Sequence, residues 1–116
     1  MGTLEYVAAQ YIAEIDDRTL AHLQIVICNK LRRDERFTLR LEPGDGTSGP
    51  VTVMWLTSAL PLLFTYSRPT RHDINGAWLQ LLADAATSNA GLWVVPEPEL
   101  RAPTSEQTAR PERMRA

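Results

Sequence analysis

The sequence predicts an α+β domain in which two helices cover one face of an antiparallel sheet. Helical periods of apolar residues span residues 16–33 and 73–88, and apolar and polar residues alternate in segments of 3–15 and 36–66. The expected order is strand, strand, helix, three strands and helix, to which residues 92–95 can add a short final strand at an edge. A chain of 116 residues is the right size for one hydrophobic core.

Residues 3–15 predict two short strands joined by a turn at Ala8-Ala9-Gln10. This turn has no Gly or Asn to favour it. A helix over the same residues is the competing interpretation, because Ala, Gln and Glu are compatible with one.

Residues 16–33 predict an amphipathic helix of about four turns. Asp16 or Asp17 is the expected N-cap, where a carboxylate also suits the positive end of the helix dipole. Basic residues fill the last turn, where cations are favoured. The centre of the apolar stripe is formed by Leu20, Ile27 and Leu31.

Two apolar residues of this helix, Ile25 and Val26, lie outside the main stripe. Either the helix is wedged between the sheet and the second helix, or these residues form an interface with another subunit or a partner protein. His22 is expected on the outer, solvated face. Cys28 is the only cysteine, which excludes an internal disulfide, and is expected to pack rather than react.

Residues 36–42, 51–55 and 61–66 predict three strands of an antiparallel meander. The Gly-rich segment 44–49 is interpreted as a hairpin loop, because it lacks the Gly-Lys-Ser/Thr ending of a phosphate-binding loop. Asp73 is the expected N-cap of a helix that ends near Ser88. Four aromatic residues are expected in or near the core: Phe37, Trp55, Phe64 and Trp78.

Residues 1–95 are predicted to form the single domain and residues 96–116 a disordered tail. The tail is rich in Pro, with Glu and Arg in equal number, and such a segment buries too little apolar surface to offset its chain entropy. No apolar run approaches the roughly 20 residues that span a bilayer. The first residues lack the basic start and apolar core of a signal peptide. The sequence therefore predicts a cytoplasmic protein without membrane partners.

No catalytic constellation, metal site or cofactor site is predicted. His22 and His72 are the only histidines, and no Gly-x-Ser-x-Gly motif is present. The net charge of −2 weighs against a dedicated nucleic-acid binder. One basic group could form a phosphate-contacting edge, although Asp34 and Glu35 lie inside it and nucleic acid is not the favoured partner: Lys30, Arg32, Arg33, Arg36 and Arg40.

Several short motifs together cover residues 1–98: Met1-Gly2 with Leu4 and Tyr6, Asp16–Leu23, Lys30–Arg33, Trp55-Leu56, Ala77-Trp78, Gly91-Leu92 and Val94–Pro98. In these motifs the chain resembles a family of short actinobacterial proteins of unassigned function, whose members are often labelled ATP-dependent DNA ligase. The resemblance implies a small α+β domain. Adenylyl transfer by such ligases needs a Lys-x-Asp-Gly motif, whereas Lys30 is followed here by Leu-Arg-Arg.

The favoured function is therefore a small non-enzymatic interaction or accessory domain. Its partner would be an unknown protein, or a second copy bound through the open sheet face or the first helix. A DNA-associated protein related to the ligase label and a small-molecule sensor that uses the aromatic residues are the alternatives.

Overall fold

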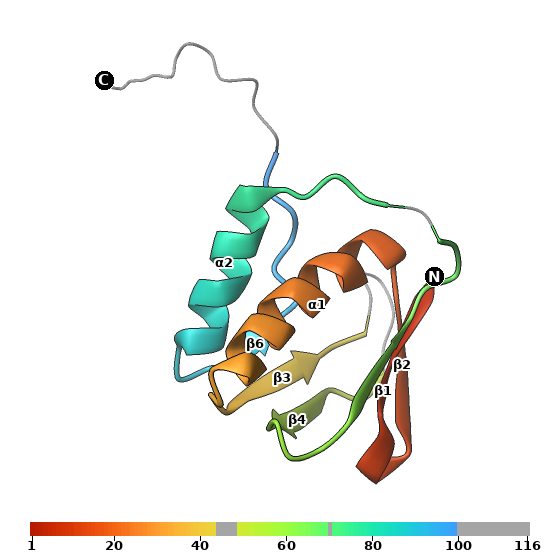
Figure 1. The fold of residues 1–116 in the computed structure, drawn as a ribbon, viewed down its shortest axis with the longest axis vertical. Helices are drawn as coiled ribbons and strands as arrows, with labels where there is room; N and C mark the ends of the chain where they lie inside the picture. The colour runs from red at the N-terminus through yellow and green to blue at the C-terminus, as the bar shows by residue number, and fades with distance from the viewer. Residues whose placement is uncertain (44–48, 70, 100–116) are drawn as a thin grey trace.

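Two three-stranded sheets and two helices make up the fold (Figure 1). The computed structural model describes residues 1–43, 49–69 and 71–99. Most of the Gly-rich segment, residues 44–48, and residues 100–116 of the predicted tail lie outside the described residues. The α+β class and the order of elements are confirmed.

Sheet A has the strand order β2-β1-β5 and contains the predicted N-terminal hairpin. Strands β1 (Gly2–Tyr6) and β2 (Tyr11–Ile15) pair antiparallel, and a single turn of 3-10 helix, η1 (Val7–Ala9), joins them. Gln10 completes the turn with a φ of 55°, which takes the left-handed position that Gly or Asn usually fills. The competing helical interpretation of residues 3–15 is wrong.

Sheet B has the strand order β4-β3-β6. Strands β3 (Phe37–Leu41) and β4 (Thr52–Leu56) form an antiparallel pair, and the short strand β6 (Leu92–Trp93) adds to β3 in parallel at the edge. Gly91 precedes β6 with a φ of 86°, and a Cβ at this position would collide with the side chain of Thr38. Glycine thus lets the chain approach β3 closely enough to form β6.

The predicted three-stranded meander is wrong in its last pairing. Strand β5 (Leu62–Thr65) pairs antiparallel with β1 and not with β4, so the chain crosses from sheet B to sheet A between Leu56 and Leu62. A two-stranded hairpin is at best marginally stable by itself, and β5 provides β1 with its second neighbour. The prediction followed the rule that consecutive strands pair, which holds for most but not all connections.

Helix α1 (Asp17–Arg32) lies between α2 and the β1–β2 hairpin (Figure 1). The carboxylate of Asp16 caps its first turn by accepting hydrogen bonds from the backbone N–H groups of Arg18 and Thr19. The apolar side of α1 forms one core with residues from both sheets. Its fully buried members are Leu4, Leu20, Leu23, Ile27, Leu39, Leu56, Leu82 and Leu92.

Helix α2 (Gly76–Thr87) packs against α1 and sheet B. Its N-cap is Asn75 and not Asp73, because the Asn75 amide oxygen accepts hydrogen bonds from the N–H groups of Ala77 and Trp78. Trp78, Leu82 and Ala86 form the buried face of the helix. Two apolar residues within the predicted helical segment 73–88, Ile74 and Leu81, are exposed.

His22 is completely buried between α1 and α2, which contradicts its predicted place on a solvated face. Its Nε2 accepts a hydrogen bond from the Asn75 backbone N–H at 3.0 Å. Nδ1 lies 2.8 Å from the carbonyl oxygen of Arg18, so Nδ1 carries the proton and donates there. The ring also packs against Trp78 with centroids 4.4 Å apart. Both ring nitrogens are therefore satisfied, and this allows the burial of a polar ring.

A polar cluster, which we call the C-terminal clasp, fixes residues 95–98 against the start of both helices. The Arg18 guanidinium binds the Glu97 carboxylate through two hydrogen bonds of 3.0 and 2.7 Å. The Asn75 side chain donates to Glu97 and to the carbonyl oxygen of Pro98, and Trp78 Nε1 donates to the carbonyl oxygen of Val95. Clasp contacts thus continue beyond residue 95, where the sequence places the end of the domain.

Candidate protein-binding surface

The outer face of sheet B carries apolar side chains that remain exposed among the described residues. Alternation along β4 buries Met54 and Leu56 and turns the intervening residues outward. Trp55, expected in or near the core, is 55% exposed, and Trp93 on β6 is 43% exposed. The expected burial of Phe37 and Trp78 is confirmed, and Phe64 packs half-buried against the core.

The strand register brings these exposed residues together. Val53 on β4 and Trp93 on β6 both align with Arg40 on the central strand β3, and Trp55 aligns with Thr38. Aligned residues on neighbouring strands project to the same side of a sheet. We call this set the sheet-B face: Thr38, Arg40, Val51, Val53, Trp55 and Trp93.

A groove of about 840 Å³ adjoins the sheet-B face and runs between β2 and the segment that follows β6. Arg40 and Trp93 belong to both the groove and the face, so the two form one continuous surface. The wall of the groove mixes apolar and acidic side chains. It includes Tyr11, Ile12, Glu14, Asp16, Glu42 and Pro50.

The electrostatics of this surface are mildly acidic. The Arg40 guanidinium is neutralised by Glu42, whose carboxylate lies 2.7 Å from Arg40 Nε. Glu14 and Asp16 form no ion pair within the residues that the structure describes. A partner that placed one or two basic side chains in the groove could therefore form ion pairs with Glu14 and Asp16 without breaking an ion pair among the described residues.

The predicted basic edge is not assembled as one surface. Lys30 is only 8% exposed, and its Nζ donates to Thr87 Oγ1 at 2.7 Å and lies 3.1 Å from Glu35 Oε1. Arg33 binds the other oxygen of Glu35 at 2.9 Å. Hydrogen bonds from Lys30 and Arg33 lower the pKa of the Glu35 carboxyl below its usual range.

The three remaining basic residues of that group are exposed but separated. Arg40 lies on the outer face of sheet B, whereas α1 packs on the inner face, where Leu39 is buried. Arg32, at the end of α1, and Arg36, just before β3, are exposed and form no ion pair among the described residues. The sheet thus separates Arg40 from Arg32.

The proposed interface residues of α1 have little free surface. Val26 is buried in the core and Ile25 is half-buried, and α1 is in contact with α2. This is the wedged arrangement, and Val26 is not available to a partner. The exposure of apolar residues of β4 was not predicted from the sequence, although the pattern of the segment Val51-Thr-Val-Met-Trp-Leu56 indicates it. Apolar residues occur there at both odd and even positions, so a strand that packs against the core with one face only exposes some of them on the other.

Comparison with known families identifies the family of this chain. A family described as a domain of unknown function, DUF7882, matches residues 1–97. The chain belongs to this family. The match covers every helix and strand described for this chain and ends at Glu97 of the clasp, and it agrees with the expected resemblance to a family of unassigned function. Searches of curated proteins and of solved structures gave no significant match.

Two further findings concern the described residues. None of their helices has the length and apolar character needed to cross a membrane. They also contain no group of three or more His, Cys, Asp and Glu side chains placed to hold a metal ion.

Proposed function

We propose that this domain is a non-enzymatic interaction module that binds a segment of a partner protein on the sheet-B face and its groove. The observation that carries the proposal is the exposure of Trp55 and Trp93 on one sheet face, in register with Val53 and Arg40. Trp and Arg are the residue types most enriched among the residues that dominate binding energy at protein interfaces.

A comparison of binding free energies indicates that the sheet-B face and the groove must bind the partner together. Burying the exposed half of each of the four large apolar side chains on the face contributes on the order of 1 kcal/mol, so the set contributes about 4 kcal/mol. Association costs about 4–15 kcal/mol in lost translational and rotational freedom. The face alone would therefore bind no partner tightly, and the groove must contribute further contacts.

The partner that fits is a peptide segment with a large apolar side chain and a nearby Lys or Arg. The apolar side chain would cover Trp93 at the border of the groove, and the base would reach Glu14 or Asp16. The proposal is supported by shape, exposure and charge together.

Selection of peptides from a random display library tests the proposal. We expect enriched peptides to combine an aromatic or long aliphatic residue with a Lys or Arg. Affinity should fall about 30-fold with Trp93→Ala or Trp55→Ala, in line with a loss of roughly 2 kcal/mol at a dominant interface residue. Glu14→Gln should weaken binding about threefold and reduce its salt dependence.

Leu81→Ala is the matched control, because Leu81 is 42% exposed on α2, away from this surface. It should leave peptide affinity unchanged. Equal losses for Leu81→Ala and Trp93→Ala, or selected peptides without an apolar residue, would refute the proposal. Sedimentation at several concentrations adds a further arm: a dimer that Trp55→Ala dissociates would show that the occupant is a second copy and not a separate partner.

A DNA-associated role has weaker support. Of the five basic residues in the predicted phosphate-contacting edge, Lys30, Arg33 and Arg40 have carboxylate partners. The ligase label would further require a lysine nucleophile in a nucleotide pocket, whereas Lys30 is held between Thr87 and Glu35.

A further inference from the structure

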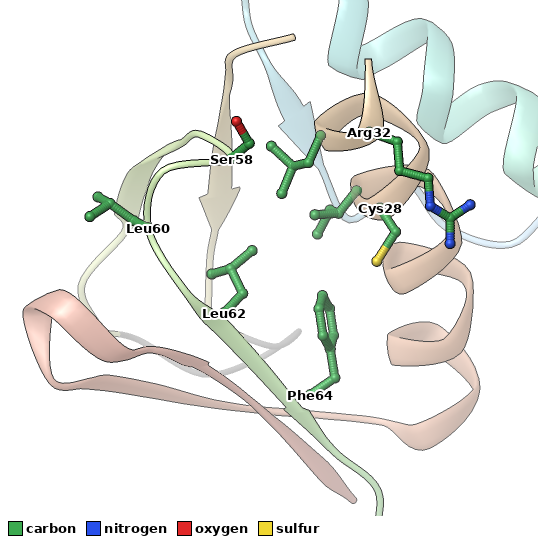
Figure 2. Close-up of a pocket in the computed structure, with 8 residues that line it drawn as sticks. Cys28, Arg32, Ser58, Leu60, Leu62 and Phe64 are labelled. Carbon is green, nitrogen blue, oxygen red and sulfur yellow. The ribbon is translucent and has the colours of Figure 1, made fainter. Parts of the chain in front are cut away.

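An apolar pocket of about 340 Å³ lies between the C-terminal half of α1 and strand β5 (Figure 2). Leu62 and Phe64 project from β5 toward α1, and the sulfur of Cys28 points back toward β5. We call this cavity the seam pocket. Its lining residues are Ile27, Cys28, Leu31, Arg32, Ser58, Leu60, Leu62 and Phe64.

The seam pocket exists because the chain changes sheets beside it. After β4 the backbone crosses to sheet A, and the connection with Ser58 and Leu60 forms one end of the pocket. Leu62 and Phe64 face α1 but remain half-buried. Hydrocarbon surface that faces inward and still meets water is stabilised by an apolar ligand that removes the water.

Among the described residues, Arg32 is a cation at the rim of the seam pocket that has no carboxylate partner. Arg32 forms only a long hydrogen bond of 3.5 Å to Asn29 Oδ1, and no ion pair within the described residues. In contrast, Arg18, Arg33 and Arg40 each bind a glutamate at 3.0 Å or less. The exposed Arg32 side chain can thus turn toward an anion at the rim without breaking an ion pair.

A carboxylate also lies beside the rim, next to the lining residue Ser58. Ser58 Oγ donates a hydrogen bond of 2.7 Å to Asp34 Oδ1. Asp34 is exposed, so water and salt weaken its repulsion of a bound anion without removing it. The position of an anionic head group at the rim is therefore set by attraction to Arg32 and repulsion from Asp34.

We propose that the seam pocket binds a small amphipathic carboxylate. Its apolar body would lie against Leu31, Leu62 and Phe64, and its carboxylate would accept hydrogen bonds from the Arg32 guanidinium. The volume admits about ten non-hydrogen atoms, at roughly 30 Å³ for each water-sized group. This site shares no lining residue with the surface proposed above for a partner protein, so either proposal can fail without the other.

Cys28 provides a built-in reporter, because it lines the pocket and is the only cysteine in the chain. The rate at which a disulfide reagent modifies Cys28 is measured with increasing octanoate, below the concentration at which octanoate forms micelles. We expect saturable protection of the thiol. Hexanoate should bind roughly 10-fold more weakly, because each buried methylene strengthens binding about threefold to fourfold.

Ligands with the same chain and different head groups test whether the pocket selects a carboxylate or binds any apolar molecule. Octanoate should protect Cys28 at lower concentration than octanol, and octylamine should protect least. Arg32→Gln should weaken octanoate about fivefold and leave octanol unchanged, whereas Asp34→Asn should strengthen octanoate about twofold. Each variant is compared with and without ligand, so a change in the intrinsic reactivity of Cys28 cancels.

Arg36→Gln is the matched control, since Arg36 is also exposed without an ion pair among the described residues but does not line the pocket. It should leave octanoate protection unchanged. No protection by octanoate, equal protection by octylamine, or equal losses for Arg32→Gln and Arg36→Gln would overturn the proposal. Protection by a peptide selected on the sheet-B face, but by no carboxylate, would assign the pocket to a protein side chain and would overturn it as well.

Discussion

The C-terminal clasp and the sheet-B face reverse the usual distribution of polarity. In the clasp Asn75 is buried, as is the neighbouring His22, and both make hydrogen bonds through both polar ends of their side chains. On the sheet-B face, Trp55 and Trp93 are exposed on the two edge strands that flank β3. One region is polar and closed, and the other is apolar and open.

The difference separates what stabilises this fold from what remains available for binding. A buried polar group is tolerated once its hydrogen bonds are made, and then it fixes one arrangement of its neighbours. An exposed tryptophan gains little from the fold, and much of its apolar surface can still be buried by another molecule. We therefore assign structure to the clasp and recognition to the sheet-B face.

The largest expected effect tests which side of β4 faces the core. Met54→Ala should lower the free energy of unfolding by about 2–5 kcal/mol, because it leaves a cavity at a buried position. Val53→Ala, one residue earlier and exposed, should cost less than about 1 kcal/mol. Urea denaturation of the two variants measures both values. Equal losses would mean that β4 does not separate a core side from an outer side.

The next effect concerns Asn75. Asn75→Ala removes the N-cap of α2 and the donor to the carbonyl oxygen of Pro98, and it should lower stability by about 2–3 kcal/mol. Asn75→Ser keeps a capping oxygen and should lose about half as much. Thermal unfolding distinguishes the two variants. If serine were as harmful as alanine, the contacts with residues 97 and 98 would outweigh the cap.

The smallest effect is a pH dependence that isolates Glu97. Hydrogen bonds from Arg18 and then from Asn75 lower the pKa of the Glu97 carboxyl from 4.5 to about 2. A carboxyl whose pKa is lower in the folded state stabilises the fold above its unfolded pKa, and this contribution is lost as the pH falls from 4.5 through about 2. Denaturation at several pH values should show a shallower acid loss for Glu97→Gln than for the wild type.

Asp17 and Glu35 act in the same direction, because hydrogen bonds from Ser67 and from Lys30, respectively, also lower their pKa values. The variant should thus retain part of the acid sensitivity, and only the difference between the two curves reports on Glu97. Identical curves would show that the ion pair with Arg18 adds nothing to stability.

Much of the fold could be predicted because its signals are local. The cap at Asp16 and the stripe of Leu20, Ile27 and Leu31 define α1 within a short window, and alternation defines β3. The pairing of β5 with β1 could not be predicted in this way. It depends on which edge needs a neighbour, and that is a property of the assembled sheet rather than of residues 61–66.

The candidate surface was missed for a related reason. Val53 and Trp55 suit an inward strand face as well as Met54 and Leu56 do, and alternation alone cannot choose between the two sets. His22 presents the opposite case. Its polarity suggests solvent, but a distant N–H group at Asn75 and the ring of Trp78 make burial favourable. Neither partner is visible in the sequence around residue 22.

The parallel pairing of β6 with β3 also determines the order in which the contacts of the domain can form during synthesis. Strand β3 must wait for Leu92 and Trp93 before its second edge is filled, and the starts of both helices must wait for Glu97. Contacts between residues so far apart in the chain form slowly. A nascent chain that has reached only α2 would therefore still lack both contacts, and the last residues of the domain to leave the ribosome are those that complete it.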